Sequence, residues 1–137
     1  MFDEAEYITS SSDGIVISAC PVLVEENRRT NDFCFGYYLC IENNSDRKIQ
    51  LVGKNWNITD DLGNRYSDTS AGFKGELPEL EPGEYFEFTS EAPLKTAHAV
   101  FYGSCKVMSE GQERVKEVKI PTFSLSAGKN VSSRILN

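Results

Sequence analysis

The sequence has little of what several classes of protein depend on. Its 137 residues contain one histidine, one tryptophan and four cysteines. No two cysteines form a C-x-x-C pair, so free and mostly buried thiols are favoured over a zinc site or a disulfide. No apolar run is long enough to span a bilayer. The acidic start lacks the basic and apolar regions of a signal peptide, so we expect a cytoplasmic protein without a membrane segment.

Positive charge is also scarce. The chain has 14 lysine and arginine residues against 21 aspartate and glutamate residues, which gives a formal net charge of −7 at pH 7. Nucleic acids and anionic membranes attract proteins that have a basic surface, so we expect neither as the main partner. A chain of this length forms one domain and buries a hydrophobic core without the help of disulfides.

Helical periodicity is missing as well. No apolar pattern with a 3.6-residue period persists for three turns. Alternation with a period of two recurs instead, between clusters of turn residues. In residues 33–43, aromatic and aliphatic side chains occupy every second position, as in a half-buried strand. The expected strands are 15–20, 33–43, 49–60, 65–68, 85–89, 97–109 and 114–120, with 123–125 resuming the last one.

About seven strands in a chain of this length predict an all-β protein that folds as a sandwich of two antiparallel sheets. We expect residues 13–127 to form this domain. Residues 1–12 and 128–137 are polar and are expected to be flexible segments.

The tryptophan and a late proline add two expectations about this sandwich. Trp56 has the same strand parity as Val52 and Ile58, so we expect it in the core, with Lys54 as the polar exception on that face. Pro121 interrupts the last predicted strand, which fits an edge strand or a change of sheet.

The stretch SAGFKGELPELEPGEYFEFTS at residues 70–90 suggests either a phosphate-binding loop or a corner between two strands. Backbone amides around Gly72, Lys74 and Gly75 could form a nest for a phosphate group. Phosphate cradles usually lie at a helix N-terminus, and the prolines that follow disfavour a helix here. We therefore expect a stiffened corner, with binding of phosphate, pyrophosphate or a nucleotide at residues 70–75 as the alternative.

Metal and catalytic chemistry have weaker support. Asp60 and Asp61 flank a predicted hairpin and offer a weak divalent-cation site, without the ligand pattern of an EF-hand. His98 has no neighbouring cluster of metal ligands. Ser104 faces the same side of its strand but lies about 20 Å from His98, too far for a nucleophile and its base. We expect neither an enzyme nor a bound cofactor.

Surface recognition is the remaining function. Tyr38, Val100 and Tyr102 have the outward parity of long predicted strands. If they cluster, they form an apolar patch suited to a protein partner or to a second copy of the chain. An exposed strand edge offers a further route, by β-augmentation. We therefore expect a binding module for a protein partner, with a homodimer as one form of that interaction.

Three segments, residues 31–68, 73–90 and 102–125, together resemble the ApaG domain family, and the resemblance extends over about residues 13–127. The most specific motifs are Trp-x-Ile-Thr-Asp at 56–60, Pro-x-Leu-x-Pro-Gly at 78–83 followed by Phe-x-Phe-Thr-Ser at 86–90, and Gly-Ser at 103–104 leading to Ile-Pro-x-Phe-x-Leu at 120–125.

The resemblance implies a fibronectin type III-like or immunoglobulin-like sandwich. It also implies a link, by name, to cobalt and magnesium efflux in bacteria. Related domains in a eukaryotic F-box protein and a polymerase-associated protein suggest an interaction module. The family usually has G-x-G-x-x-G before the proline-rich turn, where this chain has Ser70 in place of the first glycine. Glu91 likewise replaces the glycine of Thr-Ser-Gly, which leaves open whether the loop still binds a ligand.

Overall fold

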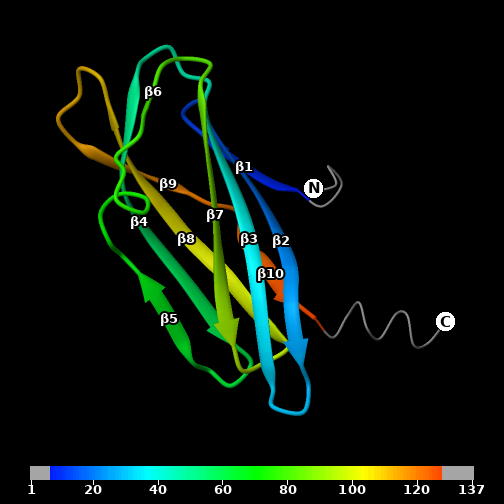
Figure 1. Ribbon diagram of the computed structural model, residues 1–137. Helices are drawn as coiled ribbons and strands as arrows, with labels where there is room; N and C mark the ends of the chain where they lie inside the picture. The colour runs from blue at the N-terminus through cyan, green and yellow to red at the C-terminus, as the bar shows by residue number, and fades with distance from the viewer. Residues whose placement is uncertain (1–6, 128–137) are drawn as a thin grey trace.

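The computed structural model describes residues 7–127, which form two antiparallel β-sheets packed face to face (Figure 1). The ten strands are β1 Ile8–Ser12, β2 Ile15–Asn27, β3 Asp32–Asn43, β4 Ile49–Asp60, β5 Arg65–Asp68, β6 Glu79–Leu80, β7 Tyr85–Leu94, β8 His98–Ser109, β9 Val115–Lys119 and β10 Phe123–Ser126. Sheet A has the strand order β1-β2-β3-β7. Sheet B has the order β10-β8-β4-β5, with β6 paired to β4 and β9 paired to β8. Within the described residues, no helix has the length and apolar character needed to cross a membrane.

The expected sandwich of two antiparallel sheets is confirmed, but it has more strands than the seven expected and begins before residue 13. Strand β1 pairs with the start of β2 and adds Ile8–Ser12 to sheet A. Its sequence, ITSSS, is polar and mostly exposed, so it lacks the apolar alternation that marks the other strands. Residues 1–6 and 128–137, which include most of the two expected flexible segments, lie outside the described residues.

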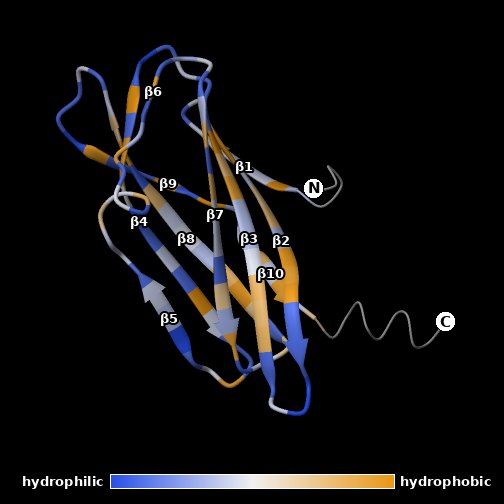
Figure 2. Ribbon diagram, in the orientation of Figure 1, coloured by the Kyte–Doolittle hydropathy of each residue, from blue (hydrophilic) through white to orange (hydrophobic). Residues whose placement is uncertain are grey.

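The core lies between the two sheets because every second residue of the long strands points inward. In β3, Phe33, Phe35, Leu39 and Ile41 are buried, as the alternation predicts. Figure 2 shows apolar and polar colours alternating along strands such as β4, while the turn between β2 and β3 is hydrophilic. The alternation of side chains therefore positions one apolar face of each sheet against the other.

Trp56 lies in this core, as the strand parity predicts. Its side chain is 3% exposed. The centre of its ring system is 5.7 Å from that of Phe73, 5.1 Å from that of Phe88 and 5.9 Å from that of Phe101. The tryptophan thus joins β4 and β8 of sheet B to β7 of sheet A.

A β-bulge in β4 changes which residues share the inward face with Trp56, and this corrects the expectation from strand parity. The pairing of β4 with β8 shifts register between Leu51 and Gly53, so the inward parity changes there. Leu51 is fully buried, whereas Val52 is only partly buried. Val52 therefore does not share the inward face of Trp56, although Lys54 and Trp56 do share one.

The edge position of Pro121 is confirmed. β9 and β10 pair with successive parts of β8, and Pro121 lies between them. Proline has no backbone N–H, so it cannot continue the ladder of hydrogen bonds. The neighbouring Ile120 N–H still donates to the carbonyl of Gly103 at 3.0 Å. The proline thus divides one edge strand of sheet B into two.

Replacing Trp56 with alanine should lower the free energy of unfolding by about 3–5 kcal/mol, since a large buried aromatic side chain is removed from the core. Urea denaturation followed by far-UV circular dichroism measures the change. Leu62→Ala, at a largely exposed turn position, is the control and should cost less than about 0.5 kcal/mol. A cost below about 1 kcal/mol for Trp56→Ala would contradict the packing described above.

Candidate functional site

The glycine loop, residues 70–75, is fastened to the core by a buried lysine. Lys54 is only 4% exposed. Its Nζ donates hydrogen bonds to the carbonyl oxygen of Gly72 at 2.6 Å and to Oγ of Ser70 at 2.9 Å. The Asp68 carboxylate lies 3.9 Å from the same nitrogen. A buried charge is tolerated when it is hydrogen-bonded and paired, so these contacts fix the loop against β4.

Phe73, at the centre of this loop, belongs to the hydrophobic core. Its ring centre lies 5.7 Å from those of Trp56, Phe86 and Phe88. The Lys54 ammonium faces the Phe73 ring at 5.3 Å and the Trp56 ring at 5.6 Å. Such cation–π contacts add to the stabilisation of a desolvated ammonium group. The loop is therefore packed into the sandwich rather than projecting from it.

Backbone amides of the loop also donate hydrogen bonds within the protein. The N–H of Gly72 donates to the carbonyl of Val52 at 3.2 Å, and Phe73 and Glu76 exchange two backbone hydrogen bonds of 2.7 and 3.1 Å. Gly72 has a φ of +75°, and a Cβ there would stand 2.6 Å from the carbonyl oxygen of Glu76. Only glycine fits this position. Two amides within residues 70–75, those of Gly72 and Phe73, are therefore already bonded.

The other two residues predicted to bind phosphate have different surroundings. The Nζ of Lys74 donates to the carbonyl of Thr89 in β7 at 2.8 Å and lies 5.2 Å from the centre of the Phe88 ring. Gly75 is exposed, with a φ of +87° and no atom within 4 Å of a Cβ built on it. The geometry favours a corner between strands, and phosphate binding at Gly72, Lys74 and Gly75 stays a prediction.

Asp60 holds the turn between β4 and β5. Its carboxylate accepts hydrogen bonds from the N–H groups of Leu62 and Asn64, both at 2.9 Å, and from Asn64 Nδ2 at 3.2 Å. Burial acts to raise the pKa of Asp60, but these bonds and the Tyr66 hydroxyl outweigh burial and leave that pKa lowered. The Asp60 carboxylate is therefore held in its charged form by hydrogen bonds within the turn.

Asp61 has a different partner. Its Oδ1 lies 3.2 Å from Nδ1 of His98. Across residues 7–127, no group of three or more histidine, cysteine, aspartate or glutamate side chains is arranged to hold a metal ion. The weak cation site predicted at Asp60 and Asp61 therefore stays a prediction that draws no support from their contacts.

The three residues predicted to form an interaction face do not come together. Tyr38 belongs to β3 and points outward from sheet A, whereas Val100 and Tyr102 belong to β8 and point outward from sheet B. The Tyr38 hydroxyl donates to Oε2 of Glu87 at 2.6 Å. The Tyr102 hydroxyl is 3.1 Å from that of Thr59. Strand parity identified each residue as outward-facing, but it does not tell which sheet a strand joins.

The two sheets differ sharply in charge. The four strands of sheet A contain no lysine or arginine and six acidic residues: Glu25, Glu26, Asp32, Glu42, Glu87 and Glu91. The strands of sheet B contain five basic residues: Lys54, Arg65, Lys106, Lys116 and Lys119. All of the acidic residues except Glu26, which is opposite the buried Phe33, have the outward register, so the outer face of sheet A is an acidic surface made by strands that are distant in sequence.

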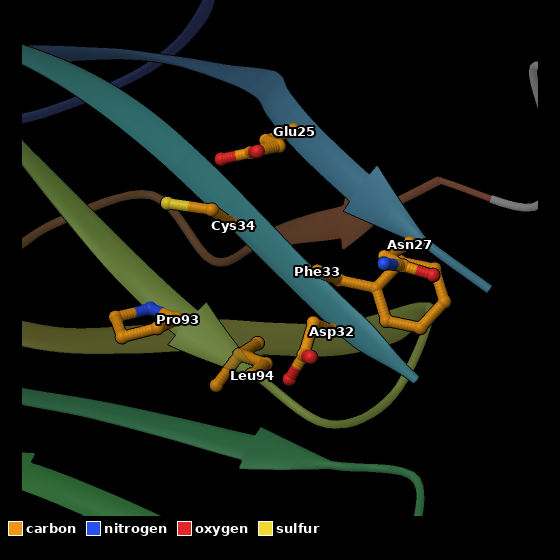
Figure 3. A pocket seen from close by; sticks show the side chains of 7 residues that line it. All are labelled: Glu25, Asn27, Asp32, Phe33, Cys34, Pro93 and Leu94. Carbon is orange, nitrogen blue, oxygen red and sulfur yellow. The ribbon is translucent and has the colours of Figure 1, made fainter. Parts of the chain in front are cut away.

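A hollow of about 360 Å³ lies at one end of this acidic face (Figure 3). Glu25, Cys34 and Pro93 are register neighbours on β2, β3 and β7 and form one row across it. The remaining lining residues are Asn27, Asp32, Phe33 and Leu94. The Cys34 thiol donates to Oε1 of Glu91 at 3.6 Å. Burial, with the nearby Glu91 carboxylate, raises the pKa of the Cys34 thiol, so it is a donor rather than a nucleophile.

Sequence reasoning did not select the residues around this hollow. The absence of lysine and arginine from residues 32–43 and 85–94 was a signal that the sequence contains. The glutamates come together only because β3 pairs with both β2 and β7. Strand pairing over long sequence separations is what the alternation pattern does not specify.

The model of the ApaG domain family matches residues 24–109. The chain belongs to this family. The protein ApaG of Bradyrhizobium diazoefficiens is 39% identical over 105 residues, which cover 77% of this chain and 78% of that protein. The protein ApaG of Agrobacterium fabrum is 36% identical over 115 residues, covering 82% of this chain and 88% of that one. The resemblance stated from the motifs is thereby confirmed.

Solved structures agree with this assignment. A crystal structure of a Bordetella pertussis protein provisionally designated ApaA aligns with a TM-score of 0.77 at 29% identity, covering 82% of this chain and 92% of that one. The span matched by the ApaG family model contains the buried Lys54, the glycine loop and the acidic hollow. Strands β1, β9 and β10 lie outside that span.

Replacing Lys54 with alanine should lower the free energy of unfolding of this ApaG domain by about 3 kcal/mol, because the buried Gly72 carbonyl loses its donor and a void remains. Lys74→Ala is the matched control. It also removes a lysine that bonds a backbone carbonyl, but at an exposed position, so it should cost less than about 1 kcal/mol. Equal costs in urea denaturation would contradict the anchoring role of Lys54.

Proposed function

We propose that this ApaG domain is a non-enzymatic binding module that docks a protein partner on the outer face of sheet A. The observation that carries the proposal is the set of apolar side chains at outward positions of this face. Val24 is 51% exposed and Tyr85 is 58% exposed. Val16, Val22 and Tyr38 are partly exposed. Exposed apolar groups within a polar surround are typical of protein interfaces.

The arrangement of these residues supports one continuous surface. Val16, Glu42 and Tyr85 are register neighbours across β2, β3 and β7. Tyr38 lies between this row and the hollow, and the Tyr7 ring stacks on it with a centroid distance of 5.8 Å. Aromatic residues of this kind supply large contact area at a low cost in conformational entropy, which suits them to interfaces.

The groups available for catalysis support the non-enzymatic part of the proposal. The imidazole of His98 is engaged by Asp61, and the Cys34 thiol has a raised pKa. Neither group has the adjacent partner that activates a nucleophile. A link between this domain and cobalt or magnesium efflux would then be indirect and would act through the bound partner.

Tyr38→Glu should weaken partner binding because it places a charge in the middle of the docking surface. The matched control is Tyr102→Glu, which makes the same change on the outer face of sheet B and also removes one hydroxyl contact. The wild-type and variant domains are immobilised, and mass spectrometry quantifies the partner protein that each of them retains. We expect a loss of about tenfold or more with Tyr38→Glu and none with Tyr102→Glu.

Equal retention by both variants would contradict docking on sheet A. Equal loss in both would contradict it as well, provided that their thermal unfolding matches that of the wild type. Light scattering of the same samples identifies self-association, which would make the partner a second copy of the chain.

A further inference from the structure

The proposed docking surface has a charge that selects the chemistry of its partner. Sheet A contains six acidic residues and no lysine or arginine in its strands. Two carboxylates of the outer face, those of Glu25 and Glu42, make no hydrogen bond or ion pair within the described part of the chain. Unpaired carboxylates beside exposed apolar groups favour a partner that brings positive charge to a partly apolar contact.

The hollow has the chemistry to hold a long cationic side chain. Glu25 and Asp32 contribute carboxylates to its lining, and the ring of the exposed Pro93 contributes apolar surface (Figure 3). Lysine and arginine side chains pack their methylene stems on apolar surface and direct the charged end to a polar group. An arginine can also bind a carboxylate through two parallel hydrogen bonds.

A neighbouring cation already binds at this end of the sheet. The ammonium of Lys95 pairs with the Asp32 carboxylate. Lys95 comes from the turn after β7 and is exposed. One carboxylate of the hollow thus binds an ammonium group within the domain, while that of Glu25 is left for a cation from outside.

A second copy of the chain does not fit this surface. The chain has a net charge of −7. A two-fold dimer formed through the outer face of sheet A would bring the glutamates of both copies together. Like charges across an interface disfavour association, so a different, basic polypeptide is the occupant that the charge favours.

We propose that the outer face of sheet A binds an extended basic segment of a partner protein, and that an arginine or lysine side chain of this segment enters the hollow beside Glu25. The inference rests on the proposed function and adds the chemical class of its partner. Val16 and Tyr85 receive the apolar side chains of the same segment. The hollow receives the cationic side chain.

The test uses the full chain labelled with ¹⁵N and two synthetic nine-residue peptides. The first alternates valine and arginine. The second replaces every arginine with citrulline, which keeps the shape and hydrogen-bonding groups but removes the charge. Amide chemical shifts are followed by NMR during each titration at low and at high salt. Glu25→Gln tests the hollow, and Glu113→Gln, in the exposed turn before β9, is the matched control.

We expect shifts confined to β2, β3 and β7 with the arginine peptide and an affinity at least about tenfold weaker with the citrulline peptide. Glu25→Gln should weaken the arginine peptide about three- to tenfold, and Glu113→Gln should leave its affinity unchanged. Raised salt should weaken binding because the attraction is electrostatic.

Each other outcome counts against a definite part of the account. Equal binding of both peptides on sheet A would overturn the requirement for a basic partner and leave the proposed docking surface in place. Equal binding to wild type and Glu25→Gln would overturn the role of the hollow. Shifts spread over both sheets, or none on sheet A, would overturn the inference as a whole, while the comparison of Tyr38→Glu with Tyr102→Glu would decide the proposed function separately.

Discussion

A single buried cation determines how one side of this ApaG domain is closed. The bulge between Leu51 and Gly53 turns Lys54 into the space between the sheets, where it must find hydrogen-bond acceptors. In the glycine loop, the Gly72 carbonyl accepts a hydrogen bond from Lys54. The residue after Gly72, Phe73, packs against Trp56 in the core. Because Lys74 donates a hydrogen bond to a backbone carbonyl of β7, the loop connects β4 of sheet B to β7 of sheet A. The polar exception in an apolar strand is thus the anchor of the corner.

This anchoring has a consequence for function. The Gly72 and Phe73 amides and the Lys74 ammonium are bonded within the protein, which leaves fewer groups of the loop for a ligand and draws attention to the outer faces of the two sheets. These faces differ, because the basic strand residues lie in sheet B and the strands of sheet A are acidic. A surface that combines exposed apolar groups with one sign of charge is suited to selective recognition of a polypeptide.

Much of the fold follows from local patterns in the sequence. Alternation predicted the long strands and the burial of Trp56, and the missing N–H of Pro121 predicted an edge. The sequence patterns failed for features that depend on residues distant in the sequence. The polar strand β1 is positioned by its pairing with β2, the bulge reverses the facing of Val52, and Tyr38 and Tyr102 lie apart because their strands join different sheets. The acidic hollow belongs to the same class, since it exists only where three strands meet in register.

Photo-crosslinking tests the central claim, that the outer face of sheet A docks a protein, most directly. A photoreactive phenylalanine derivative is introduced at Val22, on the outer face of sheet A, and separately at Asn57, on that of sheet B. Irradiation in cells should link one defined protein to the Val22 position, through a segment rich in lysine or arginine, and not to the Asn57 position. No crosslink from Val22, or the same products from both positions, would contradict it.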